Sequence, residues 1–200
     1  MSSPLHEMAN CVKLIHATSH DLADAPVQVL LQLFKDMSQI IGKLGVVFSM
    51  ATADIETKRE TIHKIINEAH IEQCNVQELI VYENGQQTSA TGATRKLLPL
   101  IRSLELVAQL LHRIHTDNTE LGECIRNAYW ETIYQYHTYL VAQGVAASTY
   151  LAPYKKDFFV SLGLTEEEAK PICVELAPML TRLHAGLKSL YIREKVWDLK

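Results

Sequence analysis

The stretch LHEMANCVKLIHATSH, residues 5–20, carries the pattern that decides the fold. Its apolar residues recur at spacings of three or four, which places them on one face of a helix. They are Leu5, Met8, Ala9, Val12 and Ile15. Helical spacing continues along nearly the whole chain, and only 8 glycines and 6 prolines among 200 residues interrupt it. The sequence therefore predicts an all-α protein.

About eight helices and no sheet are expected from this spacing. The second begins at Asp24-Ala25-Pro26, because proline is tolerated in a first turn, and runs to about residue 43. Residues 45–50 are rich in strand formers, but nothing nearby could pair with them. The other helices are expected at 54–69, 76–83, 94–114, 120–151, 155–162 and after a capping box formed by Thr165 and Glu168. Broad apolar stripes of this kind require helices packed in layers.

Composition indicates a single domain over residues 1–200, with 48% hydrophobic and 21% charged residues. Nineteen basic against 23 acidic residues give a net charge of −4, which argues against a nucleic-acid partner. The 4 cysteines are scattered and no signal peptide opens the chain, so we expect reduced thiols in a cytoplasmic protein. The longest nearly apolar stretch, 44–53, is far shorter than the ~20 residues of a membrane span. Any membrane contact should therefore be peripheral.

Nothing in the sequence indicates catalysis, a metal or a cofactor. His112 and His115 have a spacing that can chelate zinc, but no third ligand is in register with them. Cys124 has histidines within a few turns, yet a buried free thiol is the commoner arrangement. Neither a Gly-x-Ser-x-Gly motif nor a glycine-rich phosphate loop is present. We therefore expect a protein that is not an enzyme.

Three other segments carry candidate binding residues. Asp54 and Lys58 share a helix face, where they could form a solvated salt bridge. Because the preceding segment 46–51 is apolar and expected to be buried, the pair could instead lie at the rim of the core. Arg95 lies in the first turns of the helix expected at 94–114, where the macrodipole disfavours cations. This position indicates an anion nearby, unless the face is simply solvated. His137 lies in the aromatic run 129–139, where a lone histidine is usually a core or rim residue.

Taken together and in this order, the segments 48–58, 95–104 and 136–158 resemble the glycolipid transfer protein family, and in particular its members that carry ceramide-1-phosphate. The similarity extends from about residue 25 to the C-terminus. It implies a two-layer all-α sandwich with an apolar pocket between the layers for the ceramide chains. It also implies a polar surface cleft for the headgroup, and sphingolipid transfer between membranes, or sphingolipid sensing, by a monomer that contacts membranes transiently.

The resemblance also assigns roles to particular residues. Asp54 is expected to accept hydrogen bonds from the ceramide amide N–H, and His137 to donate one to the amide carbonyl. Lys58 and Arg95 are expected to face the headgroup. Sugar-carrying members usually have Asn at the position of Lys58, whereas carriers of phosphosphingolipids have Lys there. An ammonium and a guanidinium suit a phosphate, so the resemblance favours a headgroup like that of ceramide-1-phosphate.

Two positions depart from the family pattern. Pro99 replaces both the sugar-stacking Trp of glycolipid carriers and the second Arg of phosphosphingolipid carriers, which leaves Arg102 as a further headgroup neighbour beside it. Tyr139 stands where the family tends to place a membrane-docking Trp, and tyrosine is also an interfacial side chain. Two alternatives stay open: a glycosphingolipid carrier with a degenerate sugar site, and an all-α interaction module that has lost lipid binding.

Overall fold

The computed structural model describes residues 3–19 and 22–199, and this part of the chain is helical as the sequence predicts. It contains nine α-helices and three short 3-10 helices, and its only β pairing is an isolated bridge between Pro26 and Asn75. The helices are α1 (Pro4–Thr18), η1 (Leu22–Asp24), α2 (Val27–Gly42), η2 (Val46–Phe48), α3 (Ser49–Glu68), α4 (Val76–Gly85), α5 (Ala93–Thr116), α6 (Leu121–Glu131), η3 (Tyr134–Tyr136), α7 (Tyr139–Thr149), α8 (Lys155–Ser161) and α9 (Glu166–Arg193). Residue 20, the end of the first expected helix, lies outside the described residues.

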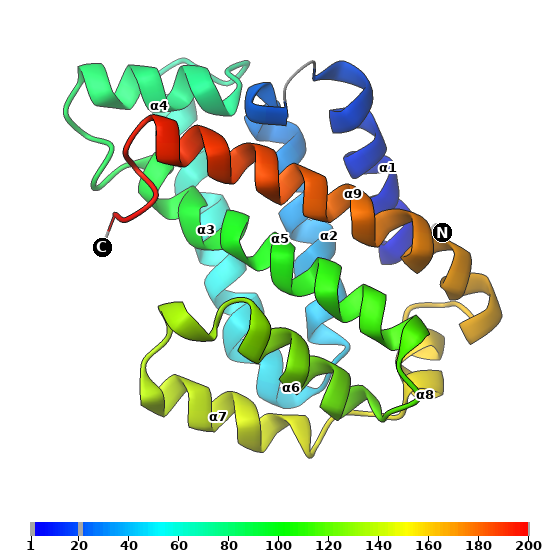
Figure 1. Cartoon of the computed structure of the whole chain (residues 1–200). Helices are drawn as coiled ribbons and strands as arrows, with labels where there is room; N and C mark the ends of the chain where they lie inside the picture. The colour runs from blue at the N-terminus through cyan, green and yellow to red at the C-terminus, as the bar shows by residue number, and fades with distance from the viewer. Residues whose placement is uncertain (1–2, 20–21, 200) are drawn as a thin grey trace.

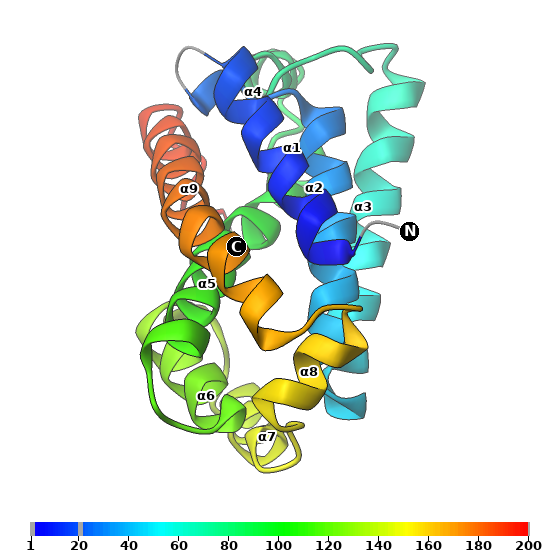
Figure 2. The same ribbon diagram turned by 90° about the vertical axis from the view of Figure 1, so that its right-hand side faces the viewer.

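The helices form the two layers that were expected. Figure 2 shows α1, α2 and α3 side by side in one layer, with α5, α6 and α9 in the other. The layers meet where α1 packs against α9 and α3 packs against α5. Helix α4 lies at one end of the molecule, and α7 and α8 lie at the other (Figure 1).

The core fills the space between the layers. All five residues of the stripe predicted on the first helix are buried. They belong to one core cluster with apolar side chains of other helices, including Phe34 on α2 and Leu104 on α5. Tyr191 of α9 is fully buried, and its hydroxyl donates to the main-chain oxygen of Thr94 at 3.0 Å. In the described part of the chain, no helix is both long and apolar enough to cross a bilayer.

Helix starts follow the chemistry of their caps. The predicted capping box is present at α9, where Thr165 and Glu168 satisfy each other's backbone N–H groups. Asn75 and Glu78 form a second box at the start of α4. Pro26 was expected inside the first turn of α2, but it is the N-cap residue and the helix begins at Val27.

The prediction of one long helix over 120–151 is wrong, and this accounts for nine helices rather than about eight. The chain leaves α6 at Thr132, passes through η3, and enters α7 after Thr138. The Thr132 hydroxyl bonds back to the Ala128 carbonyl at 2.6 Å, and the Thr138 side chain caps α7. β-Branched and aromatic residues between these threonines are poor helix formers, so the break is local in origin.

The expectation that residues 46–51 are buried is also wrong. Val46 is 90% exposed and Met50 is 82% exposed, while Phe48 is half-buried against the core. The segment turns through η2 at the end of the molecule, and of its large side chains with described burial, Phe48 reaches the core while Val46 and Met50 do not. The result is a strongly apolar surface beside the start of α3.

Candidate functional site

Helix α3 holds Asp54 and Lys58 one turn apart on one face. The Lys58 ammonium donates to Asp54 Oδ1, which forms the ion pair that the spacing predicts. The Asp54 side chain is 62% exposed and that of Lys58 only 22%, because the lysine stem lies along the protein surface. An exposed carboxylate therefore has its own cation beside it.

His137 lies in the break between α6 and α7, in an extended backbone conformation. Its Nδ1 is 2.9 Å from the hydroxyl of Tyr129, which lies on the last turns of α6. Partial burial lowers the pKa of His137, and the negative charge of Asp54 raises it in part. The imidazole and the Asp54 carboxylate are thus electrostatic neighbours, although they are 83 residues apart in the sequence.

Tyr129 was not predicted as a site residue. Its ring packs against His137 with centroids 5.5 Å apart, and burial raises the pKa of its hydroxyl, which therefore stays protonated. The sequence contained one signal for it, the density of aromatic residues around His137. That signal did not single out Tyr129, because its distance from His137 depends on the helix break between them.

Arg95 lies half-buried in the first turns of α5, and Pro99 lies one turn further along the helix and is exposed. Because α3 packs against α5, these residues are on the helix that borders α3. Among the described residues, no hydrogen bond or ion pair joins Arg95 to Asp54 or Lys58.

A buried carboxylate, that of Glu83 at 2% exposure, lies at the start of α5. Its two carboxylate oxygens accept the backbone N–H groups of Ala93 at 2.7 Å and Thr94 at 2.9 Å. A Cβ at Gly92 would lie 2.1 Å from Glu83 Oε1, so this close approach requires glycine. The protein's own carboxylate therefore stabilises the helix start next to Arg95.

Arg102 and Tyr139 were also expected at the site, as a headgroup neighbour and a membrane-docking residue. Arg102 is between the rings of Tyr136 and Trp197, where one of its amino groups donates to the Trp197 carbonyl. Tyr139 is the first residue of α7 and is 76% exposed, next to Leu140 at 81%. His112 and His115 contact each other edge to face, and no group of three or more metal-ligating side chains occurs among the described residues.

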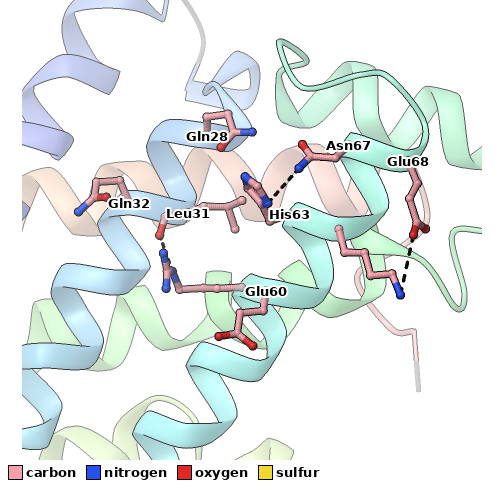
Figure 3. A pocket seen from close by; sticks show the side chains of 9 residues that line it. Gln28, Leu31, Gln32, Glu60, His63, Asn67 and Glu68 are labelled. Atoms are coloured by element: carbon pink, nitrogen blue, oxygen red, sulfur yellow. Dashed lines mark hydrogen bonds and ion pairs between the residues drawn. The ribbon is translucent and has the colours of Figure 1, made fainter.

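A separate groove of about 600 Å³ lies between α2 and α3. Figure 3 shows polar side chains along it, including Gln28, His63 and Asn67. The Arg59 Nε closes one part of the groove by donating to the Leu31 carbonyl at 2.6 Å. Neither Asp54 nor Lys58 lines this groove, so it is distinct from the predicted headgroup site.

Comparison with known proteins gives one consistent result. A family model described as glycolipid transfer protein matches residues 25–164. Bovine ceramide-1-phosphate transfer protein is 21% identical over 188 residues, which cover 86% of this chain and 88% of the relative.

Solved structures show the same helical arrangement. The apo form of mouse ceramide-1-phosphate transfer protein has a TM-score of 0.87 at 19% identity, covering 97% of this chain and 100% of that one. A fungal glycolipid transfer protein has a TM-score of 0.75 at 29% identity, covering 86% of this chain and 88% of that one. The two-layer fold is therefore shared along most of the chain.

Proposed function

The chain belongs to the glycolipid transfer protein family, and from this premise we propose that it carries sphingolipids with a ceramide-1-phosphate-like headgroup between membranes. The observation that carries the proposal is that the negative charge of Asp54 raises the pKa of His137 against the effect of burial, so a hydrogen-bond acceptor and a potential donor are within electrostatic reach of each other. A ceramide amide offers one N–H and one carbonyl, which this pair can bind together. The ceramide amide is shared by all these sphingolipids, so binding of the amide recognises the lipid class and leaves the choice of headgroup to other residues.

Tyr129 supports the role of His137 as a donor. A neutral imidazole has one N–H, and the partner of one ring nitrogen decides which nitrogen carries it. When the protonated Tyr129 hydroxyl donates to Nδ1, the proton is on Nε2. His137 then presents Nε2–H to the lipid carbonyl, and Asp54 accepts the amide N–H in a charge-assisted bond.

Lys58 and Arg95 are the residues proposed to bind the phosphate. A phosphate monoester carries close to two negative charges and three acceptor oxygens. Lys58 donates to Asp54, and a bound phosphate would share that ammonium. Pro99 adds no polar group, so the proposed phosphate site has two cations, with Arg102 held elsewhere by aromatic rings.

The ceramide chains are proposed to enter between the two layers, where the core is formed by buried apolar side chains. Membrane contact is proposed at the end of the molecule that includes α7 and the start of α3, which both views place together (Figures 1 and 2). Tyr139, Leu140, Val46 and Met50 are all exposed there. Exposed apolar side chains with an interfacial tyrosine suit the surface of a bilayer.

The state of the cysteines bears on the compartment in which the protein works. All four cysteines are free thiols, which suits the reducing cytoplasm. We place the protein there as a monomer that contacts membranes peripherally and transfers lipid without altering it. The sequence similarity to a fungal glycolipid transfer protein favours a glycosphingolipid as the second candidate ligand.

Native mass spectrometry of the purified protein tests the proposal, followed by transfer of ceramide-1-phosphate and galactosylceramide between vesicles. A co-purified sphingolipid and faster transfer of ceramide-1-phosphate are the expected results. Faster galactosylceramide transfer would replace the phosphate assignment with a sugar. Absence of both lipid binding and transfer would instead identify an interaction module.

A further inference from the structure

A cluster of one cation and two aromatic rings joins three distant segments of the chain. The guanidinium carbon of Arg102, on α5, is 3.9 Å from the ring centroid of Tyr136 and 4.9 Å from that of Trp197. The Arg102 Nη2 also donates to the main-chain oxygen of Trp197. Tyr136 belongs to η3 and Trp197 to the C-terminal segment after α9, so Arg102 links η3 to the end of the chain.

The charge of Arg102 is held in an unusual way. Burial lowers the pKa of its guanidinium, and its Nε is buried without a hydrogen-bond partner. Among the described residues, no carboxylate forms an ion pair with it. Tyr136 and the charge of Asp198 raise the pKa of Arg102 against the effect of burial, and the two aromatic rings are the main neighbours of the guanidinium.

Trp197 is itself held in place by packing against α9. It is only 9% exposed, and it packs edge to face against the buried ring of Tyr191 with centroids 6.3 Å apart. The His184 ring and the Lys188 ammonium of α9 lie beside it as well. The C-terminal segment is therefore fixed to α9, and Arg102 is held between this segment and η3.

η3 has no buried residue, so its restraints come mainly from its aromatic side chains. Tyr134 packs on Trp130, and Tyr136 lies against the Arg102 guanidinium and edge to face with Trp197 at 6.5 Å between ring centroids. The next residue after Tyr136 is His137, whose backbone N–H closes the 3-10 turn on Tyr134 at 3.0 Å. The ring of Tyr136 thus restrains the backbone from which the His137 imidazole projects.

We propose that Arg102 is a positioning residue for lipid binding: clamped by the C-terminal Trp197, it holds Tyr136 and so fixes His137 at the ceramide amide. Direct contact between Arg102 and the headgroup is disfavoured, because aromatic rings lie against the guanidinium and one amino group is bonded to Trp197. This inference rests on the proposed role of His137 in binding the amide. It adds the C-terminal segment to the determinants of that site.

Arg102→Met removes the charge and keeps the length of the side chain, and Arg182→Met on the exposed face of α9 is the matched control. Two measurements are needed. Nitrogen NMR of the His137 ring in the lipid-free protein reports its tautomer and pKa, with His137→Gln assigning the signals. A binding titration with short-chain ceramide-1-phosphate reports the effect on the ligand.

We expect Arg102→Met to shift the His137 ring signals and to weaken lipid binding about tenfold, while Arg182→Met does neither. In a His137→Ala background, Arg102→Met should weaken binding by less than about twofold, because the two residues act in one chain of contacts. Unchanged His137 signals, or an equal loss of binding in the His137→Ala background, would overturn the proposal.

Tyr136→Leu removes the stacking from the η3 side and leaves the contact of Arg102 with Trp197 in place. It should shift the same His137 signals even if Arg102→Met unfolds the protein, and unchanged signals in this variant would again contradict the proposal. The NMR measurement needs no lipid. If the wild-type protein binds no ceramide-1-phosphate, the proposed function fails while the coupling of Arg102 to His137 is still decided.

Discussion

The Tyr129 hydroxyl is 2.9 Å from His137 Nδ1, although α6 ends between the two residues. The chain leaves the helix at Thr132 and returns through η3, which brings the imidazole back over the last turns of α6. A continuous helix would place residues 129 and 137 two turns apart. The helix break therefore creates the pair, and with it the donor that the proposed amide site needs.

Tyr129→Phe should reduce ceramide-1-phosphate binding about fivefold, which corresponds to the loss of one hydrogen bond worth about 1 kcal/mol. The ring that packs on His137 is retained, so the fold should be unaffected. Binding titrations and circular dichroism measure both effects, with Tyr82→Phe on α4 as the control. Wild-type affinity in Tyr129→Phe would show that Tyr129 does not set the tautomer of His137.

Glu83→Gln should lower the free energy of unfolding by about 1.5–3 kcal/mol, because a buried carboxylate loses charge-assisted bonds to two backbone N–H groups. Urea denaturation measures this change. Glu167→Gln is the control, since Glu167 is an exposed acid in the first turn of α9 and should matter by only a few tenths of a kcal/mol. Equal effects of the two substitutions would contradict the role assigned to Glu83.

Stability should fall as the pH drops from about 7.5 to about 5.5. Burial lowers the pKa of both His137 and His184 below the ordinary value of 6.5. In this pH window the unfolded chain therefore binds more protons than the folded chain, and acidification favours unfolding. His184 faces Glu105, which raises its pKa, and Lys188, which lowers it. The buried His184 contributes a slope of at most about 1.4 kcal/mol per pH unit, and the exposed His137 contributes less because solvent screens its surroundings.

Urea denaturation across that pH range checks the prediction, and His184→Gln should flatten the dependence. A stability that rises on acidification, or a slope that His184→Gln leaves unchanged, would show that His184 is not held neutral by burial.

Pro99→Arg should tighten ceramide-1-phosphate binding about tenfold by adding a second guanidinium one turn from Arg95. The substitution also restores a backbone N–H inside α5, so it should not destabilise the helix. Pro99→Trp should instead favour galactosylceramide. Pro178→Arg, at an exposed proline inside α9, is the control. Binding titrations with both lipids measure these effects. If neither substitution changes the preference between ceramide-1-phosphate and galactosylceramide, Pro99 does not lie at the headgroup.

Much of the fold could be predicted because it depends on local patterns. The stripe from Leu5 to Ile15 and the capping box at Thr165 each specify structure within a few residues of themselves, and both are confirmed. The break at Thr132 was missed because apolar and aromatic residues continue through it at helical spacing. Thr138 was a readable N-cap signal that the periodicity concealed.

The candidate site could be predicted only where it is local. The pairing of Asp54 with Lys58 follows from a spacing of four residues, whereas the contact of Arg102 with Trp197 joins residues 95 positions apart. The exposure of Val46 and Met50 could not be predicted from their hydrophobicity, since it depends on where the end of the molecule lies. Tyr129 required the helix break before its position relative to His137 could be known.

Vesicle-to-vesicle transfer of ceramide-1-phosphate by the wild-type protein and by Asp54→Val tests the central claim most directly. We predict transfer by the wild type and a loss of about ten- to a hundredfold in affinity and transfer in Asp54→Val, because a charge-assisted hydrogen bond to the amide is removed. Circular dichroism should stay unchanged, and Glu60→Val, at an exposed acid on the same helix, should transfer normally. Wild-type transfer by a folded Asp54→Val protein would contradict the assignment of the lipid site.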